Sequence, residues 1–496
     1  MKRLPCLVLL FLGMSYFSAF AQKTATMPPL SLDSCRTMAL QHNKGIRMAQ
    51  LAVEKARHEH NAARTNYLPK LSATAAYTHL GERVSLLNND QKNSLSHLGT
   101  HLVGAITPEF AQMAQGLIAA NPGLAPLIQR VQAGMPAMAG RLNAVGRSVV
   151  DAFDTDTRNV AVGAIVLTQP LYMGGKIRAY DRITHYSEQL AGERLRADEQ
   201  ELVLEVDKAY WQVVSLVNKQ KLATAYRDML ARLHSDVEKM MAQGLATRAN
   251  ELAVSVELNK AEMTLTKVDD GLTLSRMLLA QLCGWALTDR PTLTDELLDD
   301  IAVLPGNVTP DEATALTARP ELRQLRLATQ IYGEKVKIER AAFLPTLALT
   351  AGVLGHYPSL SNGFERKLNG TWNVGVALKV PLWNWGEGRH KVAAARAEAR
   401  MAALRAEEVG EKITLQVHQG AFAVNEANRK LGLSQKSLDK AEENLRMSKL
   451  GFDEGMISTS DLLAAQTAWL VAHSDKIDAQ IDIMLTRAAY AKALGK

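Results

Sequence analysis

Two histidines flank a glutamate at His58-Glu59-His60, and side chains of these types can bind a metal ion. If the segment is helical, however, residues two positions apart point about 200° apart, so His58 and His60 would not face one ion. A metal-dependent periplasmic enzyme would depend on this group alone. The spacing therefore favours ordinary helix histidines, and we expect neither a metal site nor a cofactor.

Gly174-Gly175-Lys176 has the composition of part of a phosphate-binding loop. Pro170 occupies the place of the first glycine that such a loop requires, and neither Ser nor Thr follows Lys176. We interpret the segment as a turn between a strand and a helix. The 18 methionines favour core filling over soft-metal handling. No Ser-His-Asp, paired-carboxylate or Cys-His arrangement stands out, so we expect the chain not to be an enzyme.

The composition of the 496 residues favours a mainly helical protein. Lys and Arg number 57 against 51 Asp and Glu, and this net charge of +6 does not require a nucleic-acid partner. Aromatic residues are only 5%, and Ala, Leu, Lys, Arg, Glu and Gln fill long stretches. Outside the first residues, no segment approaches the roughly 18 consecutive apolar residues of a membrane-spanning helix. Of the three cysteines, Cys35 and Cys283 could form at most one bridge.

Residues 1–21 have the pattern of a signal peptide. Lys2-Arg3 precedes an apolar run, and Ala19-Phe20-Ala21 has the small residues of a cleavage site. We expect export and a mature chain that starts at Gln22. Cys6 does not follow a lipoprotein-type cleavage box, so no lipid anchor is expected.

The rest of the chain contains an internal duplication. Leu68-Pro69 recurs as Leu344-Pro345 at an offset of 276 residues, and Pro170-Leu171-Tyr172 recurs as Pro381-Leu382-Trp383 at an offset of 211. We divide the chain into a first repeat over 22–290, a linker or equatorial segment over 291–309 and a second repeat over 310–496. The difference of 65 between the offsets indicates an insertion at about 81–158 in the first repeat. Its prolines predict a long loop with short helices.

Each repeat is expected to contain a helix, a β-hairpin and a long helical hairpin. The expected helices are 31–67, 176–243 and 250–282 in the first repeat, and 310–343, 390–453 and 461–494 in the second. The expected strands are 71–78, 160–168, 346–353 and 371–380. Gly244 and Gly455 have the position of left-handed residues after a helix, and Thr247 and Ser458 have the position of N-caps.

Four strands are too few to close a β-barrel by themselves. A sheet in lipid must have no free edge, and single-chain barrels begin at about eight strands. Three chains would supply twelve strands and leave a lumen. Aromatic residues cluster at the strand ends, where interfacial rings would contact lipid: Tyr67, Tyr77, Tyr172, Phe343, Trp372, Trp383 and Trp385.

These features together resemble the TolC family of outer-membrane efflux and export channels. The resemblance rests on the signal peptide, the repeated Leu-Pro and Pro-Leu-aromatic-x-x-Gly segments, and the pattern Phe452-x-x-Gly455-x-x-Ser458-x-x-Asp461. It implies a homotrimer in which an α-helical tunnel across the periplasm continues into a 12-stranded β-barrel in the outer membrane. It also implies contact with outer-membrane lipid, a periplasmic adaptor protein and an inner-membrane transporter.

The resemblance assigns roles to both hairpin tips. Asp461, Arg248 and Asn250 would form the periplasmic gate, with Asn250 standing where the second repeat has Asp461. The adaptor would dock on Gly244, Leu245, Thr247, Gly455, Met456 and Ser458. A simpler interpretation is that the glycines only shape the turns and that Asp461 only caps its helix.

We expect a passive exit duct of a tripartite efflux pump, driven by the transporter. One alternative is the outer-membrane component of a type I protein secretion system. Another, from a different class, is a periplasmic coiled-coil adaptor or structural protein. For the insertion, the alternatives are an extracellular cap or recognition element and a passive loop.

Overall fold

The computed structural model describes residues 29–79, 81, 94, 96, 98–120, 125–150, 158–298, 300, 301, 303, 305–359 and 367–496. The expected signal peptide lies outside these ranges. The chain divides into two compact units. Unit 1 is the described part of Met1–Glu54, Gln189–Arg326 and Leu404–Lys496, and unit 2 is the described part of Lys55–Glu188 and Leu327–Ala403.

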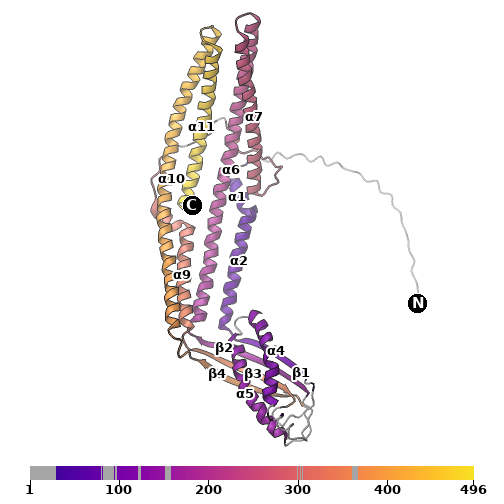
Figure 1. Cartoon of the computed structure of the whole chain (residues 1–496). Helices are drawn as coiled ribbons and strands as arrows, with labels where there is room; N and C mark the ends of the chain where they lie inside the picture. Colours follow the sequence, from indigo (N-terminus) through magenta and orange to yellow (C-terminus); the bar gives the residue numbers. More distant parts are fainter. Residues whose placement is uncertain are drawn as a thin grey trace, which may run out of the picture. The chain divides into compact units, whose positions relative to one another are not determined.

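Unit 1 is built from helices. They are α1 (Leu32–His42), α7 (Arg248–Cys283), α8 (Glu312–Ala318), α11 (Thr459–Ala493) and most of α6 (Lys176–Ala242) and α10 (Glu387–Asp453). Helices α6 and α7 form one helical hairpin, and α10 and α11 form a second (Figure 1). A short 3-10 helix, Asp295–Leu297, lies in the expected linker. The predicted hairpins are thus confirmed, with ends within a few residues of those expected.

The duplication is visible in the packing of unit 1. Val206 and Val213 of α6 are fully buried beside Ala39 of α1. Their counterparts at offsets of 211 and 276, Val417 and Val424 of α10 and Ala315 of α8, are fully buried in a second cluster. The same sequence positions therefore form equivalent cores in both repeats.

Each repeat begins with two helices where the sequence predicted one. In the first repeat, α1 ends at an extended Asn43 before α2 (Lys44–Arg64) and the 3-10 helix Thr65–Tyr67. In the second, Arg319 is extended before α9 (Pro320–Ala341). Proline disfavours the helical conformation in the residue before it, which explains the break at Arg319. The Asn43 side chain accepts a hydrogen bond from the Gly45 amide, which stabilises the matching break.

Unit 2 contains one antiparallel sheet in the order β1-β2-β3-β4. The strands are β1 (Lys70–His79), β2 (Asn159–Met173), β3 (Thr346–Tyr357) and β4 (Asn369–Lys379). The two predicted β-hairpins are confirmed, and they join through the pairing of β2 with β3. A register shift between Pro170 and Tyr172 places the proline at an irregularity, where its missing amide is tolerated. Strands β1 and β4 are the edges of the sheet.

The sheet has an apolar face and a more polar face. Cross-strand partners share a face, so Ile165, Val353 and Trp372 form one row, and all three are exposed. Val374, Val376 and Leu378 continue this face along β4 and are also exposed. The opposite face carries Ser72 in β1, Thr74 in β1, Thr168 in β2, Thr350 in β3 and Asn373 in β4. The expected aromatic residues are exposed except Phe343, which is half-buried.

The segment between β1 and β2 contains two helices, and they are not short, in contrast to the prediction for the insertion. Helix α4 (Leu98–Ala120) has 23 residues and α5 (Ala125–Val150) has 26. The two pack together, and Asn143 of α5 accepts a hydrogen bond of 2.9 Å from the Gly99 amide of α4. Pro108 and Pro136 lie inside these helices, so prolines were a poor guide to their length.

Cys35 and Cys283 are buried free cysteines, and the Cys283 thiol lies 3.6 Å from the carbonyl oxygen of Cys35. They connect α1 with α7 inside the unit 1 core without a bridge. Over the described ranges, no helix combines the length and the apolar character needed to cross a membrane.

Candidate functional site

The tip of the first hairpin is a tight turn between α6 and α7. Gly244 has a φ of +78°, a conformation that a residue with a Cβ adopts only at a cost. The Leu245 amide donates to the Met240 carbonyl and the Gly244 amide donates to the Met241 carbonyl, the two bonds of a Schellman motif. The Thr247 side chain then accepts from the Asn250 amide and caps α7. The sequence prediction of this turn is confirmed.

The second tip repeats this geometry between α10 and α11. Gly455 has a φ of +71°, and the Met456 amide donates to the Gly451 carbonyl at 2.7 Å. Ser458 and Asp461 form a capping box, in which each side chain accepts from the other residue's backbone amide. Asp461 is therefore a helix cap in the single chain. Capping does not exclude a second role in an assembly.

Both tips rest on one shared apolar cluster within unit 1. Tyr226 and Val237 of α6 are buried with Val254 of α7, Phe452 of α10 and Leu462 of α11. Beyond this cluster, Leu245 is 70% exposed and Met456 is 79% exposed. The chain therefore presents one apolar side chain to solvent at each tip.

The charged gate candidates do not contact each other within one chain. Arg248 pairs with Glu251 at 2.7 Å, at a spacing of three residues on α7. Glu251 is buried, and its Oε1 also lies 3.2 Å from Nε2 of His234 in α6. Asn250 is half-buried, one residue before this carboxylate. The sequence analysis missed Glu251, although the Arg248-x-x-Glu251 spacing on a helix could have indicated it.

Two groups of His and Glu in the described residues could hold a metal ion. One lies near the first tip and contains His234, Glu238 and Glu251. Its buried carboxylate already faces the Arg248 guanidinium, which supplies positive charge without a metal. The other contains His60, His185 and Glu188 in unit 2.

Comparison with known proteins identifies the family. The family model described as outer membrane efflux protein matches residues 131–285 and 313–496. The chain belongs to the outer membrane efflux protein family. It is 25% identical over 358 residues to the alkaline protease secretion protein AprF of Pseudomonas aeruginosa, which covers 68% of this chain and 72% of AprF. It is 23% identical over 354 residues to the outer membrane efflux protein BepC of Brucella suis, covering 69% and 74% of the two chains.

The fold agrees with this family. The crystal structure of the outer membrane protein VceC from Vibrio cholerae matches with a TM-score of 0.69 at 16% identity, covering 94% of this chain and 96% of that chain. This outer membrane efflux protein is therefore a channel protein of the outer membrane that extends into the periplasm. The family assignment favours a channel over a periplasmic adaptor.

Proposed function

We propose that three copies of this efflux protein form the passive exit duct of a tripartite pump, with the helical hairpins as the tunnel wall. The observation that carries the proposal is the sheet of unit 2. It ends in two unpaired edges, β1 and β4, and exposes an apolar face. In lipid, unpaired backbone groups cost several kcal/mol each (order of magnitude), so the edges need partners. Pairing of β1 in one chain with β4 in the next would satisfy the backbone groups of both edges.

Three chains fit the requirement better than two. Two chains would supply eight strands, and barrels of that size are filled by their own side chains. Three chains would supply twelve strands and leave room for a lumen, which the polar face of Ser72, Thr350 and Asn373 would line. The apolar face, with Trp372 and Val374, would then contact outer-membrane lipid.

The assembly is tested by mass measurement in detergent. We expect three chains per particle after extraction from outer membranes. A stable monomer or dimer that still conducts in a lipid bilayer would contradict the trimer. A monomer without conductance would instead indicate that the detergent had broken the assembly, so a second extraction with cross-linking before solubilisation is part of the measurement.

We further propose that the periplasmic adaptor docks on the two tips through Leu245 and Met456. Replacing both by Asp should abolish export, because an apolar contact becomes two buried charges. The matched control exchanges the two residues as Leu245→Met and Met456→Leu, which keeps both side chains apolar. Export is measured in cells that lack their own channel, together with the mass of the extracted particle. Normal export by the doubly charged variant would reject docking at these residues.

The transporter class decides between drug efflux and type I secretion. The name of AprF connects that relative with protease secretion, whereas BepC is named an efflux protein. We favour efflux because each tip presents a single exposed apolar side chain, Leu245 or Met456, which would not by itself select a polypeptide substrate. Co-purification of the inner-membrane partner after cross-linking tests this choice. Recovery of a transporter with an ATP-binding cassette that secretes a polypeptide would support the alternative. A passive duct needs no catalytic group, which agrees with the expectation that the chain is not an enzyme.

A further inference from the structure

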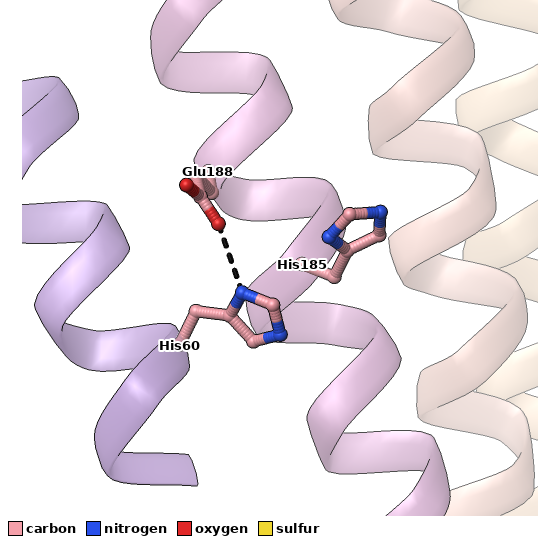
Figure 2. A group of neighbouring side chains, drawn as sticks. All are labelled: His60, His185 and Glu188. Atoms are coloured by element: carbon pink, nitrogen blue, oxygen red, sulfur yellow. Dashed lines mark hydrogen bonds and ion pairs between the residues drawn. The ribbon is translucent and has the colours of Figure 1, made fainter. Parts of the chain in front are cut away.

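Four ionisable side chains of unit 2 meet where α2 lies beside α6. His60 projects from α2, and Asp181, His185 and Glu188 project from α6. Figure 2 shows His60 directed at Glu188, with His185 on the neighbouring turn of α6. His60 Nδ1 lies 2.8 Å from Glu188 Oε2, and His60 Nε2 lies 3.4 Å from Asp181 Oδ1. The His60 and His185 ring centroids are 5.2 Å apart.

The three α6 residues share one face of their helix. Asp181, His185 and Glu188 are spaced by four and three residues, so their side chains lie one above another. His60 meets this row from the other helix. His58 and His60 of one helix cannot face one ion, but His60 of α2 and His185 of α6 come from two helices and can.

The contacts of His60 leave one carboxylate oxygen without a donor. Both ring nitrogens face carboxylate oxygens, but a neutral imidazole carries only one N–H. Asp181 Oδ1 is buried and has no hydrogen-bond partner among the described residues. A buried oxygen in this state costs about 1–3 kcal/mol, more when it is charged. An ion bound between His60 Nδ1 and Glu188 would leave the N–H of His60 on Nε2, where it can donate to Asp181, and would remove this cost.

The ligand types fit a divalent transition metal. One ligand atom from each of His60, His185 and Glu188 lies within 4.8 Å of the others. Zinc and similar ions bind imidazole nitrogen and carboxylate oxygen at about 2.0–2.2 Å, so ligand atoms must approach to about 3.4 Å in a tetrahedral site. His185 is exposed, so an ion can reach this group from solvent.

We propose that His60, His185 and Glu188 bind one divalent transition-metal ion with zinc-like ligand preference, while Asp181 accepts a hydrogen bond from the other ring nitrogen of His60. We name this group the His60 site. The ion would cross-link α2 to α6 within unit 2. The other group, with His234 and Glu251, is the weaker candidate because Arg248 already neutralises its buried carboxylate.

The full mature protein, extracted in detergent and carrying no polyhistidine tag, tests the proposal. Metal is removed with a chelator, and Co²⁺ is then titrated while its visible absorption reports nitrogen and oxygen ligands. We expect one Co²⁺ per chain, displaced by one Zn²⁺. His60→Ala and His185→Gln should each weaken binding by at least about tenfold. Zn²⁺ should also raise the melting temperature of the parent and leave that of His60→Ala unchanged.

Matched controls come from the same chain. His58→Ala removes an exposed histidine two residues from His60, and His234→Ala removes the histidine of the other group; both should bind as the parent does. Far-UV circular dichroism confirms that each variant keeps its helices. Absence of Co²⁺ binding by the parent would overturn the proposal, since His60 would then serve only as a structural partner of Glu188 and Asp181. Binding of parent strength in both His60→Ala and His185→Gln, or loss of binding in His234→Ala, would overturn it as well.

Discussion

The Arg36 guanidinium of α1 donates two hydrogen bonds of 2.7 Å each to the carboxylate of Asp207 in α6. The Asp207 side chain is only 3% exposed, and the hydrogen bonds to it raise the pKa of Arg36 above its usual value. Arg36→Met should destabilise unit 1 by about 3–5 kcal/mol, because it leaves a buried charge without a partner. Chemical unfolding in detergent, followed by circular dichroism, measures this loss.

A double variant separates the unpaired charge from the lost packing. Arg36→Met with Asp207→Leu removes both charges, and it should recover most of the stability that Arg36→Met loses. If the double variant is as unstable as the single one, the effect comes from packing at Arg36, and the ion pair is not its cause.

At the level of elements, Asp300 connects the linker between the repeats to α11. Its carboxylate accepts hydrogen bonds from Lys476 at 3.0 Å and Gln480 at 2.9 Å. Partial burial raises the pKa of Asp300, but the bonds from Gln480 and Lys476 outweigh it and lower the pKa below 3.8. The contact therefore stabilises the fold fully above pH 3.8, and this contribution is lost as the pH falls through the folded-state pKa, because the unfolded chain takes up the proton first.

Asp300→Asn should reduce stability by about 0.2–1 kcal/mol at pH 7 and have little effect near pH 2, because Asp300 is largely exposed. Melting temperatures of the parent and the variant at the two pH values measure the difference. Asp198→Asn, at an exposed carboxylate of α6, is the control. An equal deficit at both pH values would show that the charge of Asp300 does not matter.

The elements were largely predictable because their signals are local. Period, glycine and N-cap residues predicted the long helices and the tips to within a few residues, whereas β2 and β3 continue to Met173 and Tyr357, beyond the predicted ends at 168 and 353. The break at Asn43 was missed because its cause is a side-chain bond to the Gly45 amide, with no proline to mark it. The His60 site was missed for another reason. Its members are 128 residues apart at His60 and Glu188, and only the packing of two helices brings them together.

At the level of the whole molecule, the proposed trimer would place three copies of each hairpin tip around one axis. Asp461 and the Ser458 cap lie at the tip of α11, where the pattern shared with the TolC family predicts the narrow end of the tunnel. Arg248 is tied to Glu251 in its own chain, yet its side chain is 68% exposed and can meet a neighbour. We propose that trimerisation brings three Asp461 carboxylates around one axis, with Arg248 and Asn250 at the adjoining tip as the other gate residues.

Asp461→Asn tests this gate without removing the cap, because an amide oxygen can still accept from the Ser458 backbone amide. A ring of three carboxylates favours cations at a constriction, so the variant should lose cation selectivity and change conductance in single-channel recordings. Ser458→Ala is the matched control: it weakens the cap by about 0.5–2 kcal/mol and leaves the charge in place, so selectivity should persist. If Asp461→Asn keeps the parent's selectivity and conductance, Asp461 serves the helix alone. If Ser458→Ala loses selectivity as well, the cap positions the carboxylate, and the two roles of Asp461 depend on one geometry.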